Sequence, residues 1–264
     1  MIHLGTSGFS YNDWVGAFYP EGMPKREWLI YYAREFNTCE INSTYYAIPK
    51  PSTLESMAKK TGEGFLFVIK ANQKMTHERR DNEDVFRAFR EVLTPLIERG
   101  KMGCVLAQFP YSFRFNHQNR HYLETFKERL GDLPIVVEFR NMGWLRQEVF
   151  DWLRANELGF CCVDEPQLPN LLPPIAEATS KIGYVRFHGR NKEKWWNHKY
   201  AYERYDYAYT AEELEEWLPK INHLDQIAER TFAFANNHFR SKSVDTVRLL
   251  RKMLESKYPG INIS

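Results

Sequence analysis

The segment from residue 184 to residue 190 has the residue types and the spacing that point most directly to a chemical site. It reads Tyr-Val-Arg-Phe-His-Gly-Arg, which is typical of a β-strand, and the side chains of a strand alternate between its two faces. One face would carry Tyr184, Arg186, His188 and Arg190, whereas the other would carry Val185, Phe187 and Gly189. A strand that turns two arginines and a histidine to the same side is expected to line a charged, solvated pocket. The segment therefore predicts a functional site but does not name the reaction.

Short apolar runs bounded by turn residues recur along the chain and predict eight β-strands. They cover Ile2–Ser7, Thr38–Ser43, Gly64–Ala71, Gly103–Pro110, Pro134–Arg140, Gly159–Glu165, Ile182–Gly189 and Arg230–Asn237. Helical patterns lie between most of them and cover Lys25–Phe36, Pro51–Lys60, Asn82–Glu98, Gln118–Leu130, Arg146–Asn156, Ala211–Ile227 and Ser241–Ser256. The stretch from Pro166 to Pro174 is rich in proline, so the sixth helix is expected to be short or missing.

This alternation predicts an α/β fold, a TIM-type (β/α)8 barrel formed by a single domain over residues 1–264. A doubly wound open sheet is the structural alternative. No Gly-x-Gly-x-x-Gly follows any predicted strand, which disfavours the dinucleotide-binding form of that sheet. The active site of a TIM barrel lies at the C-terminal ends of the strands. An aromatic insertion at residues 191–209 follows the seventh predicted strand, and we expect it to cover such a site as a lid.

Polar side chains end seven of the eight predicted strands. The candidates are Glu40, Asn42 and Thr44 after strand two, Lys70 after strand three, Gln108 after strand four, Glu138 and Arg140 after strand five, Asp164 after strand six, Arg186, His188 and Arg190 after strand seven, and Asn236 after strand eight. Any one of them would more commonly be a loop anchor or half of a structural ion pair. Their joint occurrence favours a real site, because buried charge is costly unless it is paired or used.

The charges of these candidates favour an anionic small molecule as the ligand. The substrates considered carry a phosphate or a carboxylate and include sugar-like compounds. The cations are Lys70, Arg140, Arg186 and Arg190, and the anions are Glu40, Glu138 and Asp164. Arginine binds carboxylate and phosphate groups through two parallel hydrogen bonds. We therefore expect an enzyme in which the cations bind the substrate and Glu138 and His188 act as general base and acid, with Glu40 or Asp164 as the orienting partner. Lys70 is counted with the catalytic candidates, and Glu138→Gln is expected to abolish turnover and leave the fold intact.

The loop after the first strand adds further candidates for substrate binding. Gly5, Gly8 and Gly16 permit close backbone approach, and Ser7 with the neighbouring amides is placed to hold an anion. Tyr11 and Trp14 are placed to stack on a flat ligand. An equally good interpretation is a glycine-rich turn held in place by aromatic residues of the core.

Two other function classes remain open at this point. A metal-dependent phosphoesterase or nuclease would use Glu40, Glu138, Asp164 and His188, with His77 or His238, as ligands of a divalent metal. No short ligand motif supports that metal, and no other cofactor is evident. A non-catalytic nucleic-acid-binding or ligand-binding protein would use Trp195, Trp196 and the neighbouring tyrosines as stacking platforms, near Lys192, Lys194 and Lys199. The formal net charge of +2 disfavours a nucleic-acid partner.

The overall composition is consistent with a cytoplasmic protein. No apolar run reaches the roughly 20 residues of a membrane span, so no membrane partner is expected, and the N-terminus lacks the pattern of a signal peptide. Cys39, Cys104, Cys161 and Cys162 lie in apolar strand-like runs, as buried reduced thiols do. The adjacent pair is expected to point to opposite faces of a strand.

Several motifs together resemble the DUF72 family, also called the YecE-like family. They are Gly5-Thr6-Ser7-Gly8-Phe9-Ser10-Tyr11 with Trp14, Gly16 and Phe18-Tyr19-Pro20; Glu40-Ile41-Asn42-Ser43-Thr44-Tyr45-Tyr46 with Pro49; Phe67-Val68-Ile69-Lys70 with Thr76-His77; Gln108-Phe109-Pro110; Val137-Glu138-Phe139-Arg140 with Trp144; and Val185-Arg186-Phe187-His188-Gly189-Arg190. The resemblance runs from residue 1 to about residue 240. It implies a TIM barrel and a site at these motifs, but the family brings no established reaction. Phe9 and Ser43–Tyr46 depart mildly from its pattern and keep the aromatic character.

Overall fold

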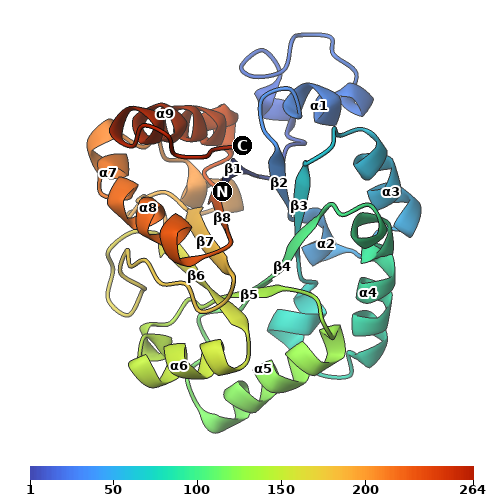
Figure 1. The fold of residues 1–264 in the computed structure, drawn as a ribbon, viewed down its shortest axis with the longest axis vertical. Helices are drawn as coiled ribbons and strands as arrows, with labels where there is room; N and C mark the ends of the chain where they lie inside the picture. Colours follow the sequence, from blue (N-terminus) through green and yellow to red (C-terminus); the bar gives the residue numbers. More distant parts are fainter.

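Eight parallel strands form a closed barrel in which each strand pairs with the next and the last pairs with the first (Figure 1). The computed structural model describes residues 1–264, except for the side chain of Ala201. The strands are β1 (Ile2–Ser7), β2 (Thr38–Ile41), β3 (Leu66–Lys70), β4 (Met102–Gln108), β5 (Ile135–Glu138), β6 (Leu158–Asp164), β7 (Ile182–Phe187) and β8 (Arg230–Ala235). The predicted (β/α)8 barrel is confirmed, and the predicted strands differ from the observed ones by a few residues at their ends.

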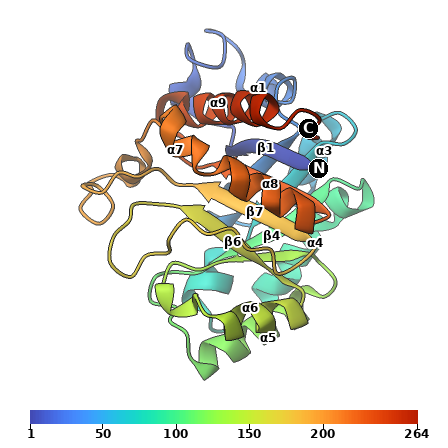
Figure 2. The same ribbon diagram turned by 60° about the vertical axis from the view of Figure 1, so that its left-hand side comes forward.

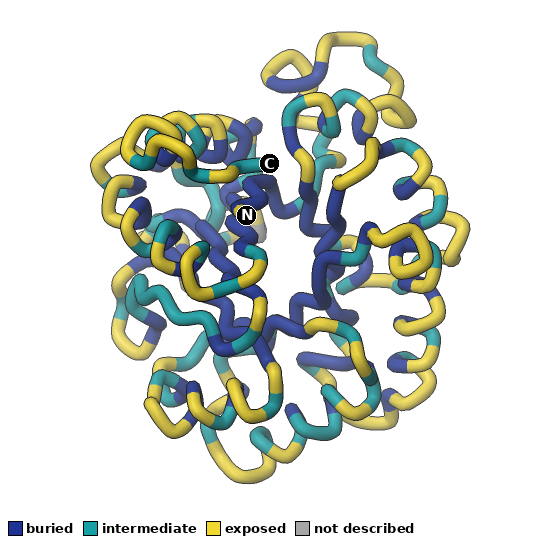
Figure 3. Tube along the Cα trace, in the orientation of Figure 1, coloured by how far each residue is buried: buried dark blue, intermediate teal, exposed yellow. Residues whose placement is uncertain are grey.

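Helices surround the barrel, as expected when apolar strands are buried on both faces (Figures 1 and 3). They are α1 (Lys25–Tyr32), α2 (Ser43–Tyr46), α3 (Pro51–Lys59), α4 (Glu83–Glu98), α5 (His117–Leu130), α6 (Gln147–Ala155), α7 (Ala211–Glu215), α8 (Leu218–Ile227) and α9 (Lys242–Lys257). Short one-turn segments lie at Asn12–Trp14 (η1), Lys74–Glu78 (η2), Met142–Trp144 (η3), Ala201–Tyr205 (η4) and Phe239–Ser241 (η5). None of the helices in the described structure is long and apolar enough to cross a membrane.

The connection from β6 to β7 is irregular, as the prolines of this stretch predicted. Residues 165–181 form turns and bends without a helix. The prediction of one continuous helix over residues 211–227 is wrong, because the structure has two helices there, α7 and α8, which are separated at Trp217. Pro219 lies in the first turn of α8, where its missing N–H breaks no helical hydrogen bond.

Both ends of the chain lie at the N-terminal end of the barrel, whereas the aromatic insertion lies at the other end (Figure 2). The N–H of Ile2 donates to the carbonyl of Asn262 at 2.8 Å, which joins the two termini. The insertion begins where β7 leaves the sheet, and Gly189 has a φ of +88° there. A Cβ at this position would lie 2.6 Å from the Cβ of Tyr207, so both the backbone angle and the packing require glycine.

Candidate active site at the C-terminal mouth of the barrel

Arg186 of β7 lies at the centre of the buried charges inside the barrel. Its Nη2 lies 2.6 Å from Oε1 of Glu40 on β2, and its Nη1 lies 2.5 Å from Oε2 of Glu138 on β5. The second oxygen of Glu40 accepts a hydrogen bond of 2.7 Å from the hydroxyl of Tyr184, which precedes Arg186 on the same face of β7. The alternation of β7 therefore places Tyr184 and Arg186 in the interior as predicted.

Arg140 forms a second buried ion-pair group immediately after β5. Its Nε lies 2.5 Å from Oε1 of Glu138, and its Nη1 lies 3.1 Å from Oε2 of Glu165. The other oxygen of Glu165 accepts from the backbone N–H of Leu172 at 3.1 Å. Glu138 is thus shared between two arginines.

His188 lies between these charged groups and is fully buried. Its Nε2 is 3.1 Å from Nη2 of Arg140 and 3.2 Å from Oε1 of Glu138, and its Nδ1 is 3.0 Å from the side-chain amide of Asn236. Burial and the positive charge of Arg140 lower the pKa of His188 to about 3. The imidazole is therefore neutral at neutral pH, which disfavours the predicted role of His188 as a cationic proton donor.

Glu138 is also a poor base in this arrangement. Burial alone would raise the pKa of Glu138, but Arg140, Arg186 and His188 together hold it well below its usual value. A carboxylate with so low a pKa accepts a proton reluctantly. The structure therefore favours a structural role for Glu138, which is to hold two arginines in place.

Glu165 and Lys70 are the groups near the mouth with a pKa close to neutrality. Burial raises the pKa of Glu165 to about 7 although Arg140 opposes that shift, and burial with the nearby Arg186 lowers the pKa of Lys70 to about 8. Nζ of Lys70 lies 4.6 Å from the ring centre of Tyr45. Lys70 forms no ion pair and no hydrogen bond through Nζ with any side chain that the structure describes.

Two adjoining cavities open at this end of the barrel, with volumes of about 380 Å³ and about 310 Å³. Lys70, Arg140 and Tyr205 line both of them, as do Tyr45 and Tyr46. Arg186 lines the first cavity and Arg204 lines the second. No aspartate or glutamate is among the described residues that line either one. The carboxylates lie behind the arginines, so the surface offered to a ligand carries positive charge.

Several polar atoms at these cavities lack a protein partner. They include Oδ1 of Asn42, Nε of Arg186 and Nδ1 of His238 at the first cavity and Nε of Arg204 at the second. A buried polar atom without a hydrogen bond costs free energy, and these four atoms are themselves buried within side chains that line the cavities.

The aromatic insertion covers the mouth as predicted. Trp195 is buried, lies 5.8 Å from the guanidinium of Arg140 and contacts the ring of His188 at 6.4 Å between centres. Arg204 stacks over Trp195 at 5.4 Å, and Tyr205 lines both cavities. Of the two tryptophans predicted as stacking platforms for nucleic acid, Trp195 is only 1% exposed and has no free ring face for a nucleobase. Trp196 is 55% exposed.

The structure places Asp164 and Arg190 outside this site. The carboxylate of Asp164 accepts from Nε and Nη2 of Arg190, from the hydroxyl of Tyr209 at 2.5 Å and from the indole N–H of Trp217 at 2.7 Å. These contacts anchor the end of the insertion to β6. The positive φ of Gly189 ends the strand alternation, which explains why Arg190 does not continue the face of His188.

Glu165, which follows Asp164, is the acidic residue of this strand end that faces the mouth. Sγ of Cys161 lies 4.0 Å from Glu138 inside the barrel, whereas Sγ of Cys162 contacts the backbone of Glu177 outside it. The predicted opposite orientation of these two cysteines is confirmed, and the four cysteines are buried and free. Odd-numbered residues of β6 therefore face inward, so Asp164, on the outer face with Cys162, does not belong with the candidates that the sequence analysis placed at the mouth.

The loop after β1 contributes less to the mouth than the sequence analysis expected. Trp14 is fully buried and donates through its indole N–H to the carbonyl of His238 at 2.7 Å, so it belongs to the core. Ser7 is buried beneath Arg186, 3.5 Å from Nη2. Tyr11 does line the first cavity and stacks on His238 with 4.4 Å between ring centres.

The remaining predicted residues divide between cavity wall and support. Asn42 and Asn236 line the first cavity, and Gln108 lines the second. Thr44 is buried and donates to the carbonyl of Lys70 at 2.7 Å. Sequence reasoning did not single out Glu165 or Arg204. The position of Arg204 among the aromatic residues of the insertion was the available signal.

The potential metal ligands do not converge. The described side chains contain no group of three or more His, Cys, Asp or Glu residues arranged to hold a metal ion. The oxygens of Glu40 and Glu138 face arginines, and Asp164 belongs to the separate anchor. This arrangement gives no support to the predicted alternative of a site built from Glu40, Glu138, Asp164 and His188.

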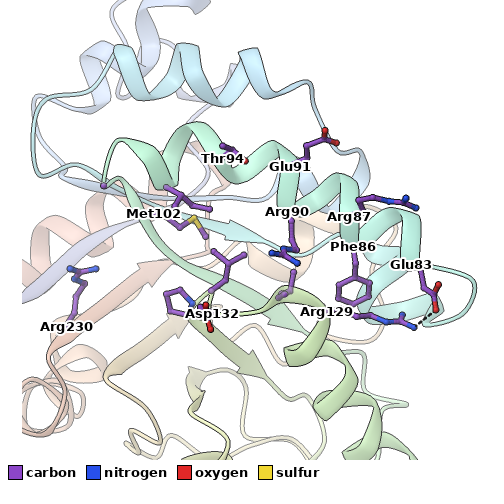
Figure 4. A pocket seen from close by; sticks show the side chains of 15 residues that line it. Glu83, Phe86, Arg87, Arg90, Glu91, Thr94, Met102, Arg129, Asp132 and Arg230 are labelled. Carbon is purple, nitrogen blue, oxygen red and sulfur yellow. Dashed lines mark hydrogen bonds and ion pairs between the residues drawn. The ribbon is translucent and has the colours of Figure 1, made fainter.

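Another hollow, of about 1020 Å³, runs along α4 and reaches the N-terminal ends of β4 and β8 (Figure 4). Both arginines and acidic residues line it, and Arg129 pairs with Glu83 at 3.0 Å. Arg90, Glu91 and Asp132 are exposed to solvent. This mixed, solvated lining lacks the buried unpartnered atoms of the mouth and is the weaker candidate for a site.

These features define a (β/α)8-barrel protein with a charged, lidded cavity at the C-terminal ends of its strands. The chain belongs to the family described as "Protein of unknown function DUF72", whose model matches residues 3–263. The resemblance drawn from the sequence motifs is thereby confirmed.

Relatives and solved structures agree with this assignment. The UPF0759 protein YunF of Bacillus subtilis is 32% identical and covers 99% of this chain and 97% of its own length. The UPF0759 protein YecE of Escherichia coli is 31% identical over 43% of this chain and 39% of its own. The DUF72 family protein of Thermotoga maritima superposes with a TM-score of 0.89 at 36% identity, covering 97% of this chain and 99% of the other. The corresponding protein of Enterococcus faecalis gives a TM-score of 0.87 at 27% identity, covering 99% and 98%.

Proposed function

We propose that this protein is an enzyme that binds a small anionic substrate at the C-terminal mouth of the barrel. The observation that carries the proposal is the charge of the cavity walls. Lys70, Arg140, Arg186 and Arg204 line the two cavities, and no described carboxylate does. Positive groups in a partly desolvated wall attract a phosphate or carboxylate more strongly than they would in water.

The buried carboxylates support this site by fixing the arginines. Glu40 and Glu138 hold Arg186 from inside the barrel, and Glu138 and Glu165 hold Arg140. Cations whose positions are fixed before binding lose little freedom when an anion arrives. Nε of Arg186 has no protein partner but is itself buried, so Arg186 would act on the anion mainly through its positive charge at the cavity wall.

Lys70 is the strongest candidate for acid–base chemistry at this mouth. It lines both cavities and has a pKa of about 8, which is near the operating pH of most enzymes. The sequence analysis assigned base and acid to Glu138 and His188, but the low pKa of each favours a supporting role. Glu165, with a pKa of about 7, contacts Arg140 from behind the cavity.

The size and the walls of the cavities support a small, hydroxylated ligand. Volumes of about 380 Å³ and about 310 Å³ lie at the lower end of the range of ligand pockets. Tyr11, Tyr45 and Tyr205 contribute aromatic side chains to the first cavity, and Asn42 contributes an amide side chain. A phosphorylated or carboxylated compound of a few carbons, with hydroxyl groups, fits this description.

A thermal-shift titration with inorganic phosphate and with malonate tests anion binding. A ligand that binds the folded state raises the melting temperature by mass action. We expect both anions to stabilise the wild type more than chloride does at equal ionic strength. Arg204→Ala and Lys70→Met should lose most of this gain, whereas Arg26→Ala and Lys50→Met, at exposed positions, should keep it. Equal gains in all five proteins would contradict an anion site at the mouth.

A further inference from the structure

We propose that Lys70 is an amine nucleophile that forms an imine with a carbonyl compound bearing one anionic group. This inference rests on the proposed function, because the anion site is what would bring the carbonyl to the amine. The inference goes beyond the proposed function in two respects. It identifies Nζ of Lys70 as the reactive atom, and it assigns the ligand a carbonyl group in addition to its anionic group.

The surroundings of Lys70 leave its nitrogen free to react. Among the described side chains, none forms an ion pair with Nζ of Lys70 and none accepts a hydrogen bond from it. Lys70 also lines both cavities. Lys101 provides a contrast within the same chain. Its Nζ donates to the carbonyl and hydroxyl of Thr61, each at 2.8 Å, and to the carbonyl of Gly62 at 2.7 Å, so its amine is fully occupied.

Burial, together with the positive charges near Lys70, favours its neutral amine. Arg186 and Arg140 disfavour a further cation there, and Glu40 and Glu138, which act the other way, already face those arginines. With a pKa of about 8, about a tenth of Lys70 is free amine at pH 7, whereas an ordinary lysine has less than about a thousandth. His77, whose pKa is lowered to about 4 by burial and by Lys70, is uncharged beside it.

Imine formation at Lys70 has two stages. The amine adds to the carbonyl carbon to give a carbinolamine, which then loses water to give the imine, so one carbonyl oxygen leaves as water and no oxidant or reductant is needed. The free-amine fraction of Lys70 adds directly and its ammonium proton goes to solvent, because His77, which lines the same cavity with a pKa of about 4, is too weak a base to take it. The ring of Tyr45, 4.6 Å from Nζ, then stabilises the protonated imine through its π face.

The cavity walls also indicate the rest of the ligand. Arg140 and Arg186 line the first cavity and supply positive charge suited to a carboxylate or a phosphate, and Asn42 adds a polar side chain to the same wall for a ligand hydroxyl. A 2-oxo carboxylate and a phosphorylated hydroxyaldehyde share this chemistry. Pyruvate and glyceraldehyde 3-phosphate represent these two sources.

Reductive trapping followed by peptide mapping tests the proposal. The full-length wild-type protein is incubated with each probe at pH 7 and treated with cyanoborohydride, which reduces an imine to a stable secondary amine. We expect at least one probe to modify Lys70 at least tenfold more than the exposed Lys74, with no modification at Lys101. Pyruvate alone would indicate a carboxylate ligand, and glyceraldehyde 3-phosphate alone would indicate a phosphate ligand.

Variants separate this proposal from the proposed function. Lys70→Arg cannot form an imine, so it should lose the adduct, whereas the exposed Lys74→Arg should keep both the adduct and the stabilisation by phosphate. Phosphate stabilisation without preferential trapping at Lys70 by either probe would overturn the imine and leave the anion site standing. Absence of both would overturn both. The mapping of wild-type protein gives the answer even if a variant does not fold.

Discussion

Arg186 and Glu138 form an ion pair across the interior of the barrel, with Nη1 of the arginine 2.5 Å from Oε2 of the glutamate. Both side chains are almost fully buried. Because Glu138 also faces Arg140 and His188, its charge compensates two cations from two different strand ends. This relationship explains why the mouth can present arginines to a ligand without presenting carboxylates.

Replacement of Glu138 by glutamine should destabilise the fold. The change leaves Arg140 and Arg186 with uncompensated buried charge, and removal of one partner of a buried pair typically costs about 3–5 kcal/mol. Urea denaturation should show this loss in the free energy of unfolding. Glu148 is exposed and pairs with Arg146 at 3.5 Å. The control change Glu148→Gln should therefore alter the free energy of unfolding by less than about 1 kcal/mol. A fully stable Glu138→Gln protein would instead agree with the sequence-based expectation of an intact fold.

Asp164 should matter for the anchoring of the insertion. Arg190, Tyr209 and Trp217 all donate to the carboxylate of Asp164. In Asp164→Asn one of the two accepting oxygens becomes an amide nitrogen and the negative charge is lost. We expect a loss of about 3 kcal/mol in the free energy of unfolding and faster tryptic cleavage within residues 191–209. Asp151→Asn, at an exposed helical position, is the control. Unchanged cleavage in Asp164→Asn would contradict the anchoring role.

The fold could be predicted because its signals are local. Apolar runs bounded by turn residues marked every strand, and the prolines of residues 166–174 marked the irregular sixth unit. Polar residues among apolar neighbours also marked the inward faces of β2, β3, β5 and β7, which brought Glu40, Lys70, Glu138 and Arg186 together.

The errors in the site arose where this local signal is absent. In β6 both faces are apolar up to Val163, so nothing in the pattern shows whether Asp164 or Glu165 faces the mouth. At the end of β7 the positive φ of Gly189 breaks the alternation that placed Arg190 in the site. Arg204 reaches the mouth through an irregular insertion, which has no periodicity from which its direction could be predicted.

The raised pKa of Glu165 gives the stability of the protein a specific pH dependence. A carboxyl with a pKa of about 7 when folded and 4.5 when unfolded binds more protons in the folded state between these values. Its contribution to stability therefore falls as pH rises from about 4.5 to about 7, by about 3 kcal/mol at most. Glu138 and His188 have lowered pKa values, so their contribution to stability has the opposite pH dependence: it is lost as pH falls.

A comparison of the wild type with Glu165→Gln isolates this contribution. Glutamine does not titrate, so the variant should gain stability relative to the wild type when the pH is raised from 5 to 8. The measurement is the difference in unfolding free energy between the two proteins at each pH, with Glu148→Gln as the control. A difference that stays constant between pH 5 and pH 8 would show that Glu165 does not titrate in this window.

Gly189→Ala should disturb the entry to the lid more than an equivalent change elsewhere. Gly189 and Gly22 both have a positive φ, +88° and +77°, so alanine incurs backbone strain of about 1–3 kcal/mol at either position. Only at Gly189 does the new Cβ also meet a neighbour, at 2.6 Å from the Cβ of Tyr207, whereas nothing lies within 4 Å of a Cβ at Gly22. The melting temperature should therefore fall further in Gly189→Ala than in Gly22→Ala. Because Gly189 directs the chain from β7 into the insertion, Gly189→Ala should also weaken stabilisation by phosphate, whereas Gly22→Ala should not. Equal melting temperatures and equal phosphate responses would show that the contact with Tyr207 does not hold the insertion over the mouth.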